Sequence, residues 1–406
     1  MLRARRLLLA LGVLALPVWS AAPASADDVR GSQQVVIDTL ALPRAWQITK
    51  GAGVLVAVLD SGVDPRHRDL AGSVTVGKDF TVGANPPGVA PSRLHGTYMA
   101  SLIAGHGHGP GGGDGVIGVA PEARLLSVRV ILEDEEPGFT TFNSEERFEN
   151  VVAKGIRYAV DQGADVINMS ISKELATKEE RAAVRYALAK GVVLVAAAGN
   201  DGEGKKVAPY SYPAAFPGVV SVAATDRGLR RASFSNANPS VLIAAPGVDI
   251  LGAGPGDQYW VGQGTSQATA LVSGVAALIK AEHPKMSPAL VAQALTAGAT
   301  GDGYTTKTGF GVVNAARSLA EAGKLSRHTT TAKAAAHDAA RPLGPGVADP
   351  VQVIHRDERH ILVHGAFGVG ALIGVAGCAG AAIWLVRRSG RPAPVLTGLI
   401  AHDPPP

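Results

Sequence analysis

Val54-Leu55-Val56-Ala57-Val58-Leu59-Asp60-Ser61-Gly62 contains an unbroken apolar run that ends on a carboxylate. Strict alternation of apolar and polar residues indicates a strand with one face exposed to solvent. An unbroken apolar run is instead typical of a parallel strand that is buried on both faces. In open parallel sheets, ligands bind outside the carboxyl ends of the strands. The stretch therefore predicts a parallel sheet that carries Asp60 at its functional edge.

After this stretch the chain alternates between strand-like and helix-like segments. Helices are predicted from Val151 to a stop at Gly163, over 179–190 and over 267–283. Repeated strand–helix–strand units predict the α/β class, with a doubly wound, mostly parallel sheet and helices on both faces. Short apolar segments predict further strands at 166–169, 192–197 and 219–222.

Four chemically distinct side chains lie beside glycine or small residues along this pattern. Asp60 follows the first strand and Asn200 follows a later one, so both are expected at one edge of the sheet. His95-Gly96-Thr97 opens an apolar segment, and Gly264-Thr265-Ser266 immediately precedes the last predicted helix. A nucleophile, a base, an orienting carboxylate and an oxyanion donor are the groups that acyl transfer needs.

Each of these residues also has an ordinary structural interpretation. A serine at a helix start is usually a cap, and Asp or Asn after a strand is often a turn residue. We favour the catalytic interpretation because all four residue types occur together in a chain order known for serine peptidases. His95 is then the general base for Ser266, and Asp60 orients the imidazole. Asn200 and the Ser266 N–H are the expected oxyanion donors.

With these motifs the chain resembles the subtilisin-like serine peptidases, from about Trp46 to Leu319. The resemblance implies a subtilisin-like fold and serine endopeptidase activity. It also implies catalytic roles for Asp60, His95 and Ser266, with Asn200 in the oxyanion hole. The segments that carry the resemblance are Val58-Leu59-Asp60-Ser61-Gly62-Val63, His95-Gly96-Thr97, Ile117-Gly118-Val119-Ala120-Pro121, Ile167-Asn168-Met169-Ser170, Ala197-Ala198-Gly199-Asn200, Tyr212-Pro213-Ala214, Gly264-Thr265-Ser266 and Gly309-Phe310-Gly311-Val312-Val313-Asn314-Ala315.

The resemblance further implies which residues bind the substrate. Ser170 and Ser172 belong to the strand that lines the substrate cleft in the family, and Ser211 is expected near the floor of the primary specificity pocket. The chain departs from the family at Ser172, where secreted subtilisins often carry glycine. It departs again at Gln267, where the family usually has an apolar residue.

Both ends of the chain carry predicted targeting signals, although a buried helix is the alternative at each end. An arginine-rich start, an apolar run and the small-residue site Ala24-Ser25-Ala26 are typical of a signal peptide. A second apolar run is long enough to span a bilayer, and Arg387 and Arg388 behind it place the tail in the cytoplasm. The catalytic domain is thus expected outside a cell membrane that one helix crosses. The predicted parts are a signal peptide at 1–26, the peptidase domain at 27–325, a linker at 326–360, a transmembrane helix at 361–386 and a cytoplasmic tail at 387–406.

The signal peptide, a short N-terminal extension and the C-terminal anchor resemble the mycosins, membrane-anchored subtilisin relatives tied to type VII secretion in actinobacteria. The expected function is extracytoplasmic, membrane-anchored serine endopeptidase activity on protein or peptide substrates, with a type VII secretion complex as partner. Two alternatives stay open: a structural subunit that stabilises a secretion complex with little or no proteolysis, and an esterase or amidase. Mycosins usually carry disulfides, whereas the one cysteine here, Cys378, lies in the apolar run.

Charge and metal-ligand patterns bear on other partners. The formal net charge of +4 comes from arginines near the two ends, so nucleic acid is not an expected partner. His106, His108 and Asp114 could bind a metal, but the glycines among them favour a mobile surface loop. The acidic runs Glu133-Asp134-Glu135-Glu136 and Glu145-Glu146 favour a solvated face, with structural calcium as the alternative. No catalytic metal or cofactor is expected.

Overall fold

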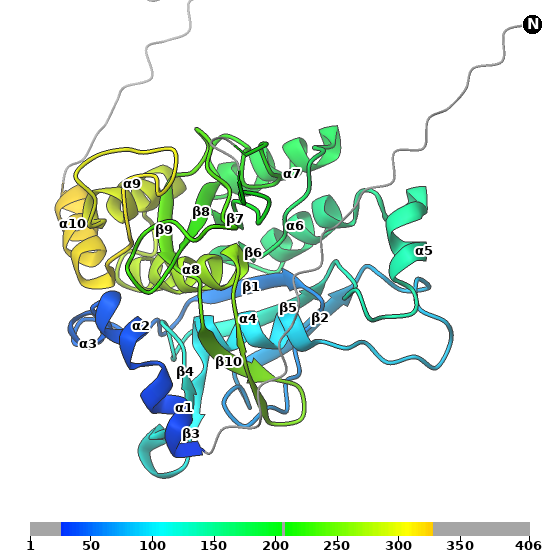
Figure 1. Ribbon diagram of the computed structural model, residues 1–406, viewed down its shortest axis with the longest axis horizontal. Coiled ribbons are helices and arrows are strands. Elements are labelled where there is room, and N and C mark those ends of the chain that lie inside the picture. Colours follow the sequence, from blue (N-terminus) through cyan, green and yellow to red (C-terminus); the bar gives the residue numbers. More distant parts are fainter. Residues whose placement is uncertain (1–25, 205–207, 328–406) are drawn as a thin grey trace, which may run out of the picture. The chain divides into compact units, whose positions relative to one another are not determined.

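A seven-stranded parallel sheet forms the centre of the fold (Figure 1). The computed structural model describes residues 26–204 and 208–327. The strand order is β2-β5-β1-β6-β7-β8-β9, and the order reverses around β1 as in doubly wound sheets. The strands are β1 (Leu55–Asp60), β2 (Val74–Asp79), β5 (Arg124–Arg129), β6 (Val166–Met169), β7 (Val193–Ala197), β8 (Val220–Thr225) and β9 (Ile243–Pro246).

Helices cover both faces of the sheet, as the unbroken apolar strands predict. In β1, Val56 and Val58 face the core that contains α4 (Leu94–Ala104) and α8 (Thr265–Glu282). Ala57 and Leu59 face the opposite core, formed with α6 (Val151–Asp161) and α7 (Lys178–Ala189). Full burial of each such Val or Leu side chain contributes about 1.5–3 kcal/mol. The predicted α/β class and parallel sheet are confirmed.

Local sequence signals explain where α7 begins and where α6 and α7 end. Thr177 accepts a hydrogen bond from the Glu180 N–H, and the Glu180 side chain accepts one from the Thr177 N–H, which makes a capping box at the start of α7. Gly163 and Gly191, which follow α6 and α7, have φ of +82° and +81°. Glycine reaches this left-handed conformation without strain, so each residue ends its helix and turns the chain into the next strand.

The helix that carries Ser266 begins earlier than predicted. The sequence indicates a start at Gln267, but α8 begins at Thr265, so Ser266 lies inside the first turn. The first N–H groups of a helix have no intrahelical partner. The Ser266 N–H is therefore one of the free donors at this helix start.

Smaller elements surround the sheet, and the sequence did not predict them. Antiparallel hairpins join β3 to β4 and β10 to β11. Among the N-terminal helices, α1 packs on β4 and α3 on α10 (Figure 1). The bounds are α1 (Ala26–Ser32), α2 (Gln34–Thr39), α3 (Leu42–Ala45), β3 (His106–His108), η1 (Pro110–Gly112), β4 (Asp114–Ile117), α5 (Phe139–Ser144), η2 (Glu146–Phe148), β10 (Ile250–Gly254), β11 (Gln258–Gly262), α9 (Pro288–Gly298) and α10 (Ala315–Arg327).

The predicted targeting segments fall almost wholly outside the described residues. Only Ala26, which begins α1, belongs to the predicted signal peptide, and α10 continues through Ser326 and Arg327, the first residues of the predicted linker. The predicted transmembrane helix and tail lie beyond the described residues. Within 26–204 and 208–327, none of the helices combines the length and the apolar character needed to cross a bilayer.

Candidate active site

The Asp60 carboxylate and the His95 imidazole meet at the carboxyl edge of the sheet. Asp60 is the last residue of β1 and is fully buried, and its Oδ1 lies 2.7 Å from His95 Nδ1. The same oxygen accepts a hydrogen bond from the Ser61 N–H over 2.8 Å, which fixes the carboxylate. With Nδ1 facing the carboxylate, Nε2 is the nitrogen left to take a proton from another group.

Burial and two carboxylates act in opposite directions on His95. Burial lowers the pKa of the imidazole, whereas the charge and hydrogen bond of Asp60 and the charge of Glu133 raise it. The net direction is upward from the ordinary value of 6.5. A raised pKa makes the imidazole a stronger proton acceptor, as general-base chemistry needs.

Ser266 lies in the first turn of α8, next to the segment that follows β6. Its Oγ donates a long hydrogen bond of 3.3 Å to the Ser170 carbonyl, and the Ser170 hydroxyl donates to the Ser266 carbonyl over 3.0 Å. Because β6 pairs with β1, and α8 packs against α4, Ser266 belongs to the same region as Asp60 and His95. The structure thus places the Ser266 hydroxyl at the same edge of the sheet as Asp60 and His95, where it is hydrogen-bonded to Ser170 and not to the imidazole.

Asn200 is held beside Ser266 by its amide oxygen. Oδ1 accepts hydrogen bonds from the Thr265 N–H over 3.0 Å and from the Thr265 hydroxyl over 2.9 Å. Because the oxygen is used in this way, the Nδ2 amide group is left as the free donor. Gly199, with φ of +103°, makes the turn that carries Asn200 from β7 to this position. The amide donor and the Ser266 N–H therefore border the same space.

The three serines predicted to bind substrate lie in two hydrogen-bonded pairs. Ser170 is paired with Ser266 as described above. Ser172 and Ser211 lie with their hydroxyl oxygens 2.5 Å apart, although Ser172 is exposed and Ser211 is buried. Backbone hydrogen bonds between Lys173 and Tyr212 hold the two segments together. The structure therefore brings Ser211 to the segment that contains Ser170 and Ser172.

The acidic run at 133–136 is not the solvated face that the sequence predicted. Glu133 is half-buried and accepts a hydrogen bond from the His95 N–H over 2.9 Å. Glu136 is buried and binds the Arg129 guanidinium over 2.6 Å. Only Asp134 and Glu135 are exposed. The prediction was wrong because a run of charges gives no sign that two of its members turn inward to partners from other elements.

The histidines of the predicted mobile loop are instead fixed in a hairpin. His106 and His108 form β3, and His108 Nδ1 lies 2.6 Å from Oδ1 of the fully buried Asp69. Oδ2 of Asp69 accepts hydrogen bonds from the Val116 N–H and the Tyr259 hydroxyl. Among the described residues, no cluster of three or more His, Cys, Asp or Glu side chains is arranged to hold a metal ion.

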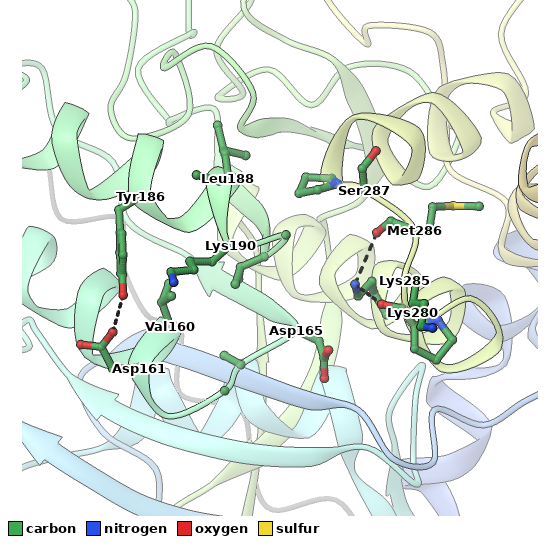
Figure 2. Close-up of a pocket in the computed structure, with 17 residues that line it drawn as sticks. Val160, Asp161, Asp165, Tyr186, Leu188, Lys190, Lys280, Lys285, Met286 and Ser287 are labelled. Atoms are coloured by element: carbon green, nitrogen blue, oxygen red, sulfur yellow. Dashed lines mark hydrogen bonds between the residues drawn. The ribbon is translucent and has the colours of Figure 1, made fainter. Parts of the chain in front are cut away.

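A pocket of about 810 Å³ opens at the opposite edge of the sheet (Figure 2). Its lining includes Asp165 and Val192, which directly precede β6 and β7, so it lies at the amino ends of these strands. The Lys280 ammonium inside it donates to the carbonyl oxygens of Pro284 and Met286. This pocket therefore lies at the other edge of the sheet from Asp60 and Ser266.

Comparisons of sequence agree with this geometry. A family model described as the Subtilase family matches residues 51–318, which contain Asp60, His95, Asn200 and Ser266. Thermitase from Thermoactinomyces vulgaris is 38% identical over 256 residues, which cover 63% of this chain and 85% of thermitase. The match therefore spans most of the peptidase domain.

Solved structures give the same result and bear out the resemblance to mycosins. MycP1 from Mycobacterium smegmatis aligns with a TM-score of 0.59 at 30% identity, covering 70% of this chain and 84% of MycP1. The MycP3 protease, described as from the type VII (ESX-3) secretion system, aligns with a TM-score of 0.58 at 33% identity, covering 70% of this chain and 87% of MycP3. The chain thus belongs to the subtilase family and is a subtilisin-like serine endopeptidase similar to the mycosins.

Proposed function

We propose that the chain cleaves peptide bonds through an acyl-enzyme, with Ser266 as nucleophile, His95 as general base and Asp60 as the group that orients the imidazole. The observation that carries the proposal is the 2.7 Å contact between Asp60 Oδ1 and His95 Nδ1. A buried carboxylate on Nδ1 selects the tautomer whose Nε2 accepts a proton. Further support comes from Asn200, which is hydrogen-bonded to Thr265, the residue before Ser266.

In the first step, the Ser266 hydroxyl exchanges its long bond to the Ser170 carbonyl for one to His95 Nε2. Catalytic hydrogen bonds are often long before substrate binds, so this geometry fits the role. Oγ then attacks the scissile carbonyl carbon, its proton moves to Nε2, and the carbonyl electron pair moves to the oxygen. Asp60 stabilises the imidazolium that forms.

The negative oxygen is stabilised by Asn200 Nδ2 and the Ser266 N–H, which the hydrogen bonds to Thr265 hold in place. One such donor contributes roughly 3–4 kcal/mol in subtilisin itself. The intermediate collapses, the C–N bond breaks, and the amine leaves with the proton from His95. Water then attacks the acyl-enzyme, with His95 again accepting a proton, and releases the acid product.

The assignment of the nucleophile is tested with a fluorophosphonate probe, which phosphonylates an activated serine hydroxyl. The wild-type chain is expected to be labelled, and Ser266→Ala is expected to lose both labelling and peptidase activity. Ser326→Ala, an exposed site at the end of α10, is the matched control. Labelling that persists in Ser266→Ala would overturn the assignment.

The substrate is proposed to lie against Ser170, Ser172 and Ser211. Ser170 touches Ser266 directly, and the Ser172–Ser211 pair borders the turn at Gly199, where a Cβ atom would lie 2.9 Å from Ser172 Oγ. A substrate residue at this point therefore meets hydroxyl groups. A peptide library assayed with Ser172→Gly and Ser211→Gly is expected to show altered preference at the residue before the cleaved bond. Unchanged preferences in both variants would contradict these contacts.

The proposal includes a membrane anchor and an extracytoplasmic catalytic domain. It rests on the apolar run at 361–386, the arginines behind it and the signal-like N-terminus. Fractionation of cells that express the full chain is expected to place it in the membrane fraction. Protease added to intact spheroplasts is expected to digest the catalytic domain. Protection of that domain from the added protease would contradict the proposed orientation.

The type VII secretion context is proposed from the similarity to MycP1 and MycP3. A secretion defect shared by a Ser266→Ala strain and a deletion strain would support a role that needs proteolysis. Full secretion with Ser266→Ala but none after deletion would favour the structural-subunit alternative. Normal secretion in both strains would contradict a role in secretion.

A further inference from the structure

Helix α4, which carries His95, begins without a cap of its own. Its N-cap residue, Arg93, has φ of +58° and makes no side-chain hydrogen bond to the helix. The N–H groups of the first turn need partners from elsewhere. Two residues from other elements supply them: Glu133 Oε1 accepts from the His95 N–H over 2.9 Å, and Ser61 Oγ accepts from the Gly96 N–H over 3.0 Å.

These two capping groups are also bonded to each other. The Ser61 hydroxyl donates to Glu133 Oε1 over 2.6 Å, and Ser92 donates to Oε2 over 2.6 Å. Ser61 directly follows Asp60, so a single carboxylate contacts both the chain beside Asp60 and the backbone of His95. A carboxylate at a helix N-terminus is also favoured by the helix dipole.

We propose that Glu133 is a positioning residue for the catalytic imidazole: it holds His95 against Asp60 and keeps a negative charge beside it. The inference rests on the proposed roles of Asp60 and His95. Glu133 acts through His95 and not on the substrate. The backbone of Glu133 is itself held in place, because its N–H donates to Oε1 of the buried Glu136 over 3.2 Å.

The charges around His95 decide what the loss of Glu133 would do. Asp60 contacts the imidazole from β1, whereas Glu133, in the segment after β5, contacts the backbone N–H of His95 and acts on the imidazole through its charge. The Arg129 guanidinium lies behind Ser61, donates to the Ser61 carbonyl, and is already paired with Asp79 and Glu136. Arg93 precedes α4, and its side chain lies beside Gly62.

A neutral residue at 133 therefore removes one of the influences that raise the pKa of His95. The imidazole would then stay unprotonated to lower pH and remain active as a base there. In a plot of reaction rate against pH, the acid limb, where the rate falls as His95 is protonated, would move to lower pH. A cap with a purely structural role would change the maximum rate and leave the position of this limb unchanged.

The test measures the rate of fluorophosphonate labelling against pH in the full-length, detergent-solubilised protein. Glu133→Gln keeps an oxygen that can accept from His95 and Ser61 but removes the charge. We expect its maximum rate to stay within about threefold of wild type and its acid limb to lie at lower pH. Glu133→Ala removes charge and acceptor together, and we expect about a tenfold lower maximum rate, equivalent to about 1.4 kcal/mol.

Glu135→Gln is the matched control because Glu135 is exposed and undergoes the same chemical change. We expect its acid limb to remain at the wild-type position. An unshifted limb in Glu133→Gln, or an equal shift in Glu135→Gln, would overturn the proposal. Circular dichroism checks that each variant is folded. Parallel loss of labelling in Ser266→Ala shows that the signal comes from the proposed nucleophile, so a failure at Glu133 is distinguished from a failure of the proposed function.

Discussion

His95 Nδ1 lies 2.7 Å from Asp60 Oδ1, and the two residues occupy the first turn of α4 and the last position of β1. The other carboxylate oxygen, Oδ2, is buried and has no hydrogen-bond partner within the described part of the chain. The carboxylate is therefore committed to the imidazole and to the Ser61 N–H. This single contact sets both the orientation and the tautomer of the His95 imidazole.

If the proposed roles hold, replacing Asp60 by Asn is expected to lower kcat by roughly 10⁴-fold, the loss that this change causes in a characterised Ser-His-Asp triad. The amide has the same shape, but it no longer favours the tautomer that leaves Nε2 unprotonated, and it cannot stabilise an imidazolium. Peptidase kinetics on the purified chain measure the effect. Asp161→Asn makes the same change at the exposed end of α6, on the opposite edge of the sheet, and is expected to leave kcat unchanged. Equal losses in both variants would mean that general destabilisation is the cause.

The raised pKa of His95 predicts the pH dependence of the wild type. In the proposed mechanism His95 accepts a proton only when its imidazole is neutral, so activity is expected to be lost as pH falls through the folded-state pKa. Since burial is outweighed by Asp60 and Glu133, the acid limb of kcat/KM is expected above pH 6.5. By the same linkage, the stabilisation of the fold by protonated His95 is present below the ordinary pKa and disappears as pH rises through the folded-state value. A limb centred below 6.5 would contradict the direction of this shift.

Asn200 has two separable roles, because its oxygen anchors Thr265 and its amide nitrogen is the proposed oxyanion donor. Asn200→Asp keeps an oxygen for the Thr265 N–H and hydroxyl but loses the N–H donor. It is expected to lower kcat by about 10²–10³-fold with little change in KM. Asn200→Ala also removes the anchor, so a larger loss is expected. Steady-state kinetics on a peptide substrate separate the two cases, and an unchanged kcat in Asn200→Asp would exclude a donor role.

Much of the fold follows from the unbroken apolar runs in the sequence. Unbroken apolar strands such as β1 and β7 are buried on both faces, and this pattern leaves few alternatives to a parallel sheet covered by helices. Parallel strands end at a common edge, so the approach of Asp60 and Asn200 to one region could be expected without coordinates. Helix starts were harder, because α8 uses Gly264 as its N-cap residue and lacks a side-chain cap signal.

The residues whose roles were not predicted from the sequence are held by partners from other structural elements. Glu133 contacts Ser61 and His95, and Glu136 contacts Arg129. In the sequence these two residues are visible only as members of a run of acidic residues. His108 likewise pairs with Asp69, which lies 39 positions away. Local composition carries no information about such pairs, because the sheet topology decides which strand ends and hairpins become neighbours.

The backbone contact between the Asp60 and His95 segments gives a last prediction. Gly96 follows His95, and a Cβ atom there would lie 2.0 Å from the carbonyl oxygen of Gly62. The backbones at Gly62 and Gly96 cannot easily move apart, because the Ser61 hydroxyl also accepts a hydrogen bond from the Gly96 N–H. Gly96→Ala is therefore expected to destabilise the fold by about 1–3 kcal/mol and to move His95 from Asp60. Denaturant unfolding and the fluorophosphonate labelling rate measure the two effects.

The matched control for this change is Gly323→Ala in α10. A Cβ atom at Gly323 would meet no neighbour within 4 Å, and the residue lies inside a helix. Alanine there is expected to stabilise the fold by about 0.5–1 kcal/mol, because it lowers the entropy lost on folding. Labelling should stay at the wild-type rate. If Gly96→Ala also kept wild-type stability and labelling, the close approach of Gly62 and Gly96 could not be what sets the distance between Asp60 and His95.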